Sequence, residues 1–387
     1  MPWKEARIVD ERVRFIAAVA EDPRGNFTRL CASFGISRAK GYKWLERYER
    51  LGPAGLEDQR PVAKSCPHRT PDDVVDRIIT LRKRFPFDGP KKLRVRLRDI
   101  EGADFVLPAA STIGEILDRY GLVRPRRSRL RVPPSTEPLA HAELPNDVWC
   151  TDFKGHFACG DGTRCHPLTI TDAMSRYLVK CEGLPGEKEG PVREQFELAF
   201  REFGVPRRIR SDNGAPFASK ALGGLSRLSM WWIQLGIVPE RIEPGKPQQN
   251  GRHERMHKTL KEQTANPPAA TPIDQQRAFD RFRADYNDHR PHEALGLTPP
   301  ARHYEPSLRP MPERLRAPVY GDDFDVRRVG ANGILKFRNK RLTVSTLFAD
   351  QPLGLQRVDE EEWDLHYGPV LLGHVLLRNG ELRLERP

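Results

Sequence analysis

The chain has 387 residues, long enough for several domains, and carries 65 Lys and Arg against 53 Asp and Glu, a formal net charge of +12. This excess favours a polyanionic partner, most commonly nucleic acid; a basic soluble protein without such a partner is the alternative. The first residues lack an apolar signal segment and no run of 18 apolar residues follows them, so we expect a soluble intracellular protein with no membrane partner.

Six cysteines are scattered along the chain without a Cys-x-x-Cys pair, at positions 31, 66, 150, 159, 165 and 181. His68 and His166 lie near two of them, but the spacing does not match that of a structural zinc site. We therefore expect reduced thiols, as is usual in a cytosolic protein.

Residues 1–60 form the first predicted domain, a helix-turn-helix centred on residues 27–37. Gly35 permits the tight turn between the two helices, and Ser37 can cap the second helix. That second helix carries basic residues that can face a DNA groove, namely Arg38, Lys40, Lys43 and Arg47. The alternative is a small helical bundle with a solvated basic face.

Residues 61–124 predict a second DNA-binding unit that resembles a helix-turn-helix. Apolar residues at helical spacing follow Asp72-Asp73, and a basic helix spans residues 91–98. A capped helix beginning at Ser111 and ended by Gly121 completes the unit. Two tandem modules can read a longer DNA site than one.

Residues 125–144 are rich in arginine and proline and predict a semi-extended linker without a core. Its arginines can follow phosphates or enter a minor groove, in particular Arg126, Arg127 and Arg129. A linker that only increases solubility is the alternative.

Residues 145–304 change to a strand-rich texture, with predicted strands at 148–156, 166–172, 177–182, 207–211 and 239–242. Helices are predicted at 192–204, 225–235 and from Asn250 to about residue 263. Antiparallel strands followed by strands that alternate with helices imply a mixed five-stranded sheet flanked by helices, within a multidomain α/β protein.

Three acids in this region can meet at one crevice of the sheet. Asp152 lies in the first strand, Asp212 at the end of a later one, and Glu254 in the first turn of a helix. Clustered carboxylates are the oxygen ligands that Mg²⁺ prefers, and two divalent ions can promote phosphodiester chemistry. Residues farther along the helix of Glu254 would grip a DNA strand: His257, Lys258 and Lys261.

Other acids compete for this role, namely Asp172, Glu240, Glu243 and Glu262. We interpret Asp172 as a turn cap and Glu243 as a loop residue. The chosen trio stands out because its members combine the ends of elements with flanking glycine and asparagine.

Four phrases follow one another in this region: Trp149…Asp152-Phe153-Lys154, Ser211-Asp212-Asn213-Gly214, Pro244-Gly245-Lys246-Pro247-Gln248-Gln249-Asn250-Gly251-Arg252-His253-Glu254-Arg255, and Tyr286-Asn287…Arg290-Pro291-His292-Glu293-Ala294-Leu295. Together they resemble the integrase core of bacterial insertion-sequence transposases, relatives of retroviral integrases with a ribonuclease-H-like fold. The resemblance implies that Asp152, Asp212 and Glu254 form the catalytic triad and bind two Mg²⁺ or Mn²⁺ ions. It also implies strand cleavage at element ends, then 3′-hydroxyl attack on target DNA without a covalent enzyme intermediate.

The spacing of the second and third acids departs from the family pattern. Here 41 residues separate Asp212 from Glu254, whereas the shorter spacing of many relatives would end on Gln248, which has no carboxylate. We therefore place the glutamate by the Asn-Gly-x-x-Glu phrase. The zinc-binding His/Cys module of retroviral integrases is absent, and the tandem helix-turn-helix units take its place.

Residues 305–319 predict a second linker, and residues 320–387 a small β-barrel or sheet with turns such as Asn332-Gly333. The leading hypothesis is a DNA transposase that binds double-stranded DNA, both its own terminal inverted repeats and a target, as a homo-oligomer in the bacterial cytoplasm at the nucleoid. The alternatives are a non-catalytic DNA-binding remnant and a metal-dependent nuclease without joining activity.

Overall fold

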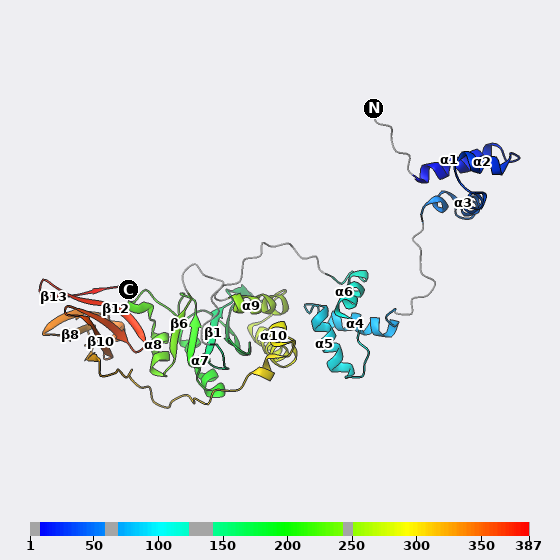
Figure 1. The fold of residues 1–387 in the computed structure, drawn as a ribbon. Helices are drawn as coiled ribbons and strands as arrows, with labels where there is room; N and C mark the ends of the chain where they lie inside the picture. Colours follow the sequence, from blue (N-terminus) through cyan, green and yellow to red (C-terminus); the bar gives the residue numbers. More distant parts are fainter. Residues whose placement is uncertain (1–7, 59–68, 124–141, 243–250, 387) are drawn as a thin grey trace. The chain divides into compact units, whose positions relative to one another are not determined.

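A computed structural model describes residues 8–58, 69–123, 142–242 and 251–386 (Figure 1). The chain divides into two compact units, Met1–Thr70 and Pro71–Pro387, and each is described by itself. Several residues singled out in the sequence lie outside the described ranges: Arg126, Arg127, Arg129, Glu243 and Asn250.

The first unit is helical, with α1 (Ile8–Glu21), α2 (Phe27–Ser33), α3 (Arg38–Leu51) and a final 3₁₀ turn, η1 (Gly52–Leu56). Its core contains Phe15, Cys31 and Trp44. Between α2 and α3, Gly35 has a φ of 64°, and the Ser37 side chain accepts the Lys40 N–H at 3.3 Å. The predicted turn and its cap are thus confirmed.

The second unit begins with three helices, α4 (Asp72–Arg84), α5 (Pro90–Glu101) and α6 (Ala110–Arg119), which share one apolar core. The predicted capping role of Ser111 is wrong, because the helix already begins at Ala110 and its N-cap, Ala109, makes no side-chain bond. Gly121 does follow the end of α6, with a φ of 66° and its N–H donated to the Asp118 carbonyl.

The central sheet contains β1 (Val148–Phe153), β2 (Phe157–Ala158), β3 (Arg164–Asp172), β4 (Leu178–Leu184), β5 (Arg208–Ser211) and β6 (Val238–Arg241). β3 pairs antiparallel with both β1 and β4, whereas β5 runs parallel to both β1 and β6. The predicted mixed sheet is confirmed, and the two-residue β2 adds a sixth strand to the five expected.

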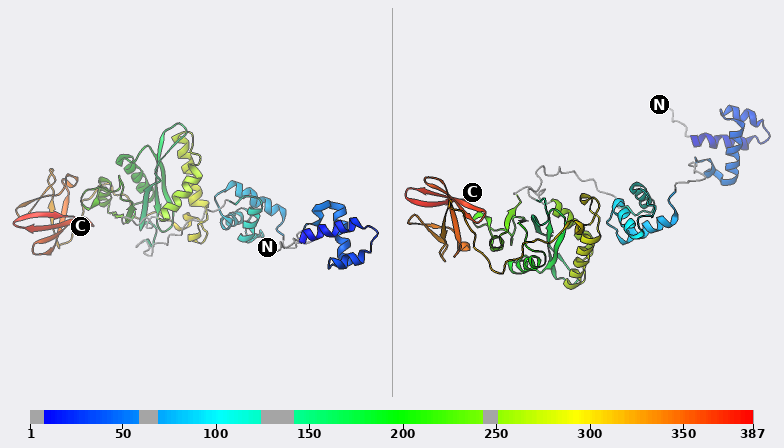
Figure 2. Two further views of the ribbon diagram at one scale, coloured as in Figure 1. Left: turned by 90° about the horizontal axis from the view of Figure 1, so that it is seen from above. Right: turned by 60° about the horizontal axis from the view of Figure 1, so that its bottom comes forward.

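Helices cover both faces of this sheet (Figure 2). One face packs its apolar side chains, including Trp149, Leu168 and Ile170, against α7 (Glu189–Phe203) and α8 (Arg227–Gln234). The other face lies under α9 (Gly251–Thr264) and α10 (Pro272–Ala284), which share a core with β3 and β4. α10 was not predicted from the sequence. Short helical turns complete this part of the chain: η2 (Leu222–Gly224), η4 (Asp285–His289), η5 (Glu293–Leu295) and η6 (Pro300–His303).

The C-terminal strands are β7 (Phe324–Arg328), β8 (Ile334–Phe337), β9 (Lys340–Thr343), β10 (Pro352–Asp359), β11 (Glu362–Tyr367), β12 (Val370–Arg378) and β13 (Glu381–Glu385), with the turn η7 (Thr346–Phe348) before β10. They form an open antiparallel sheet, ordered β13-β12-β11-β10-β7, and a β8-β9 hairpin. Of the two predicted architectures, the structure therefore has the sheet, because the described strands do not close into a barrel.

The C-terminal sheet shares a hydrophobic core with the segment around α8. Met230 and Ile233 of α8, together with Leu222 and Leu225 before it, pack among the buried residues of β10–β12. α8 is consequently buried on two sides, since Leu228 and Trp232 face the central sheet. No helix in the described part of the chain combines the length and the apolar character needed to cross a membrane.

Candidate functional site

Two of the predicted acids lie side by side at the ends of neighbouring parallel strands. β1 and β5 pair in the register Val148↔Arg208 to Cys150↔Arg210, which brings Asp152 and Asp212, each two residues beyond the last pair, to the same edge of the sheet. Asp212 follows the last residue of β5 and turns its Oδ1 back to accept the Gly214 N–H at 3.0 Å. Adjacent strands lie only about 4.8 Å apart, so these two carboxyl groups belong to one site.

Glu254 joins this site from the first turn of α9, where it is exposed. Burial, followed by the charge of Asp212, raises the pKa of Asp152 to about 7, and the charge of Glu254 adds to the increase. The Phe153 N–H and the Lys154 ammonium oppose this change. The structure thus brings all three acids within electrostatic range, and their repulsion leaves a deficit of positive charge that divalent cations fit.

A ladder of buried polar side chains fastens α9 to the sheet beside Asp152. Thr169 and Thr171 point from β3 toward α9, where His253 and His257 lie one turn apart. Thr169 Oγ1 lies 2.7 Å from His253 Nε2 and 2.6 Å from His257 Nε2. Thr171 Oγ1 lies 3.0 Å from His253 Nδ1. One ligand atom from each of Asp152, His253 and His257 falls within 4.8 Å of the others, a grouping that could hold a metal ion.

The prediction that His257 contacts DNA from an exposed face is wrong, because its side chain is only 3% exposed. Burial lowers the pKa of His257 to about 2 and that of His253 to about 3, so both rings are neutral at ordinary pH. Lys258 and Lys261 on the same helix are exposed, as expected. Sequence reasoning missed the two histidines as neighbours of Asp152, although their four-residue spacing places them on one helical face.

The competing acids that the structure describes are engaged elsewhere. Asp172 is 1% exposed and accepts bonds from the Ser175 N–H, the Ser175 hydroxyl and the Asn146 N–H, at 2.8, 2.6 and 2.7 Å. Its interpretation as a turn cap is confirmed. Glu240 forms ion pairs with Arg208 and Arg210, and Glu262 lies 3.9 Å from Lys258.

The basic residues of α3 differ in how free they are to reach a partner. Lys40 and Lys43 are exposed. Arg47 instead donates to the Glu57 carbonyl at 3.3 Å, and its guanidinium lies 4.9 Å from the centre of the Trp44 ring. Arg38 lies over Tyr42 at 5.6 Å. Lys43 Nζ likewise lies 5.5 Å from the centre of the Trp44 ring, and Arg38 is exposed, so Arg47 is the least available of the four cations.

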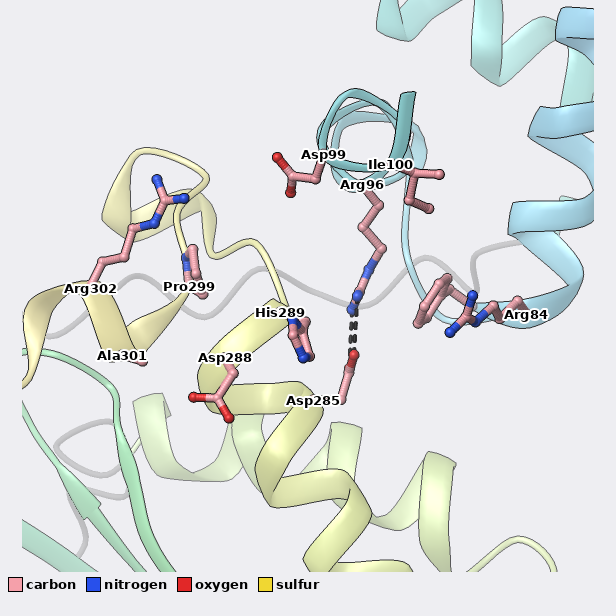
Figure 3. Close-up of a pocket in the computed structure, with 11 residues that line it drawn as sticks. Arg84, Arg96, Asp99, Ile100, Asp285, Asp288, His289, Pro299, Ala301 and Arg302 are labelled. Carbon is pink, nitrogen blue, oxygen red and sulfur yellow. Dashed lines mark hydrogen bonds and ion pairs between the residues drawn. The ribbon is translucent and has the colours of Figure 1, made fainter. Parts of the chain in front are cut away.

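Within the second unit, a buried ion network links α5 to the segment after α10. Arg96 donates to both carboxylate oxygens of Asp285 at 3.1 Å and to Asp88 at 2.7 Å, beside a pocket that also contains Arg84 and Arg302 (Figure 3). Arg290 lies 3.1 Å from Asp88. Arg290 comes from the last of the four sequence phrases, so that phrase includes a structural contact.

Another residue of that phrase, Asn287, is also structural. Its side chain is 2% exposed and bonds both main-chain groups of Leu178, accepting the N–H at 2.8 Å and donating to the carbonyl at 3.0 Å. It thereby satisfies the main-chain hydrogen-bonding groups of Leu178, the first residue of β4, next to the end of α10.

Four protein-family models match parts of the chain. Residues 142–247 and 235–300 match models of the integrase core domain. Residues 11–63 match a helix-turn-helix domain, and residues 40–117 match a homeodomain-like domain.

Relatives with similar sequences are encoded by insertion elements. The chain is 32% identical over 180 residues to the insertion element IS407 uncharacterized 31.7 kDa protein of Burkholderia multivorans (strain ATCC 17616 / 249), covering 46% of this chain and 62% of that protein. It is 32% identical over 209 residues to the insertion element IS476 uncharacterized 39.2 kDa protein of Xanthomonas euvesicatoria, covering 54% and 58%. Both matches span less than two thirds of the relative's own length. Among solved structures, the HTLV-2 integrase catalytic core domain in complex with magnesium matches 44% of this chain and 100% of that chain, at 17% identity and a TM-score of 0.34.

Proposed function

We propose that this chain is an insertion-sequence transposase with an integrase core, and that it cuts the ends of a DNA element and joins them to target DNA. The observation that carries the proposal is the convergence of three acids. Asp152 and Asp212 lie at the same edge of the sheet, at the ends of β1 and β5, and the charge of Glu254 acts on Asp152. Such a carboxylate cluster is what metal-dependent phosphoryl transfer requires.

Asp152, Asp212 and Glu254 would hold two Mg²⁺ or Mn²⁺ ions, which would polarise the scissile phosphate and activate the attacking oxygen. The chain itself fixes the positions of these carboxylates. Asp152 is held in the sheet, and Asp212 is held by its bond from the Gly214 N–H. Lys258 and Lys261, exposed farther along the helix of Glu254, would attract the phosphates of the bound strand.

The helical modules would provide recognition of the DNA ends. In the first unit, the exposed Lys40 and Lys43 would meet the phosphates beside a groove, with Arg38 and Arg47 adjacent. The proposed substrate is double-stranded DNA that carries the terminal inverted repeats of the element, together with a target duplex. Because two ends must be processed together, the active species would be a homo-oligomer on DNA.

The test is a strand cleavage and joining assay on a duplex that carries the inverted repeats flanking the gene, with Mg²⁺ and with Mn²⁺. Wild type should give cleaved and joined products, whereas Asp152→Asn, Asp212→Asn and Glu254→Gln should each lose at least about a thousandfold in rate, equivalent to roughly 4 kcal/mol of transition-state stabilisation. All three should still bind the ends. Glu262→Gln, on the same helix as Glu254, is the matched control and should stay active.

Two results would replace the proposal. Hydrolysis without joined product, even from a precut 3′-hydroxyl end, would identify a nuclease. Tight binding of the repeats without cleavage under either metal would identify a DNA-binding protein that has lost catalysis.

A further inference from the structure

The hydroxyl of Thr169 has a complete set of hydrogen-bond partners, and this set fixes which nitrogen of each histidine carries the proton. A threonine hydroxyl has one hydrogen to donate and two lone pairs. Thr169 Oγ1 donates to the Asp152 carbonyl at 3.1 Å and contacts the Nε2 atoms of His253 and His257. Since its hydrogen is used, both Nε2 atoms must carry protons and donate to Oγ1.

His253 then has no lone pair left for a ligand. Its Nε2 donates to Thr169, and its Nδ1 accepts the hydroxyl hydrogen of Thr171 at 3.0 Å. Of the two histidines that cluster with Asp152, His253 is therefore a support that holds α9 in place.

His257 differs from His253, because the same reasoning leaves one of its nitrogens available to bind an ion. With the proton on Nε2, its Nδ1 carries an in-plane lone pair, and this atom lies 3.8 Å from Asp152 Oδ2. One ion bonded to both atoms at roughly 2.0–2.2 Å can span this separation. We propose that His257 Nδ1 is a metal ligand and that it shares with Asp152 one of the ions at the carboxylate site.

This inference rests on the proposed function for the presence of the ion but adds a ligand of different chemistry. Mg²⁺ takes oxygen ligands, whereas imidazole nitrogen suits first-row transition ions and Zn²⁺. The ion at Asp152 is therefore bound by nitrogen as well as oxygen. The ratio of Mn²⁺ affinity to Mg²⁺ affinity at this site is consequently higher than at a site made of carboxylates alone.

The test uses Mn²⁺ alone, added to the metal-free full-length protein, with pulsed electron paramagnetic resonance to detect nitrogen bound to the ion. Wild type should show coupling to a directly bound imidazole nitrogen. The coupling should change from that of ¹⁴N to that of ¹⁵N when the protein is made with ¹⁵N-histidine, a control that needs no substitution. Asp152→Asn should remove it. Bound Mn²⁺ without histidine coupling in wild type would overturn the inference, as would a failure of Mn²⁺ to bind at Asp152.

Two substitutions at His257 separate the roles of its nitrogens. In His257→Gln the amide can still donate to Thr169, but the ligand atom is lost, so the coupling should disappear. In His257→Asn an oxygen replaces Nδ1, and the ratio of Mn²⁺ to Mg²⁺ affinities, measured by titration calorimetry, should fall by about tenfold. His374→Gln, in the C-terminal sheet, is the control and should change neither result. Coupling that persists in His257→Gln would assign it to another histidine and refute the proposal.

The outcomes also distinguish this inference from the proposed function. Histidine coupling in a protein that neither cleaves nor joins DNA would leave the inference standing and remove the function. Cleavage and joining by a protein whose bound Mn²⁺ shows no histidine nitrogen would refute the inference and leave the proposed function standing.

Discussion

Arg96 and Asp285 lie 189 residues apart in the chain and form an ion pair with two hydrogen bonds of 3.1 Å each. Arg96 is 5% exposed and also donates to Asp88, which is 1% exposed. The Arg96 guanidinium lies 3.9 Å from the centre of the Phe85 ring. A single side chain of α5 thus joins the three-helix bundle to the segment that follows α10.

Removing this arginine should be costly, because the half-buried Asp285 loses both of these hydrogen bonds and the buried Asp88 keeps only Arg290 of its two arginine partners. We expect Arg96→Met to lower the free energy of unfolding of the second unit by roughly 3–5 kcal/mol. Arg98→Met, on an exposed position of the same helix, should change it by less than about 0.5 kcal/mol. Calorimetric unfolding of the full chain measures both, and equal stabilities of the two variants would contradict the prediction.

The ladder of threonines and histidines predicts a graded effect. Thr169→Val leaves two buried imidazole nitrogens without their partner, Nε2 of His253 and Nε2 of His257, whereas Thr171→Val leaves one, Nδ1 of His253. An unsatisfied buried polar group costs about 1–3 kcal/mol, so the loss of stability in Thr169→Val should be close to twice that in Thr171→Val. Urea denaturation can compare them, since valine has nearly the shape of threonine. Equal losses would show that His257 does not depend on Thr169.

The raised pKa of Asp152, about 7, predicts how stability depends on pH without metal. In the unfolded chain this carboxyl ionises near its ordinary value of 3.8, so its contribution to stability is complete below about pH 4 and is lost as the pH rises through 7. Asp152→Asn has no ionisable group at this position. It should be more stable than wild type at pH 8 in EDTA by roughly 2–4 kcal/mol, since a pKa shift of one unit corresponds to about 1.4 kcal/mol.

The difference between wild type and Asp152→Asn should shrink toward pH 5, where Asp152 is protonated. Adding Mn²⁺ at pH 8 should raise the melting temperature of wild type more than that of the variant. If wild type is the more stable protein at pH 8 in EDTA, burial and the neighbouring acids do not raise the pKa of Asp152, and the prediction is contradicted.

The exposed lysines of α3 predict a change in the salt dependence of DNA binding. Each phosphate contact contributes about 0.9 to the slope of log K against log salt. Replacing both Lys40 and Lys43 with alanine should therefore reduce the slope by about 2, and Arg47→Ala should reduce it by less, because Arg47 is held by the Glu57 carbonyl. Arg14→Ala in α1 removes an exposed charge paired with Glu11 and is the control. An unchanged slope for the double variant would place α3 away from the DNA.

Much of the central sheet was predictable because its strands carry strong local signals. Strands are indicated directly by the apolar residues of β3 and β4 and by the glycine that follows β5. The ends of the parallel strands β1 and β5 bring Asp152 and Asp212 to one edge of the sheet. α10 gave a weak signal because its buried face contains Phe279, Phe282 and a polar residue, Gln275. A polar residue on a buried face breaks the apolar period on which such predictions depend.

The position of His257 could not be predicted for a different reason. Its spacing from Glu254 indicates only that the two share a side of α9, and it does not say which residues meet the sheet. The structure shows that β3 presents Thr169 and Thr171 rather than apolar side chains at this contact, so histidines can be buried there. That partner choice depends on the pairing of elements more than 80 residues apart.

The two-sided burial of α8 has a consequence for how the protein is made. The integrase core lacks the cover for Met230 and Ile233 until β10–β12 have left the ribosome. At about 5–20 residues per second, the segment from residue 320 to residue 378 takes roughly 3–12 seconds to synthesise. During that interval the nascent chain exposes an apolar surface, and we expect the integrase core to complete its folding only after the C-terminal strands emerge.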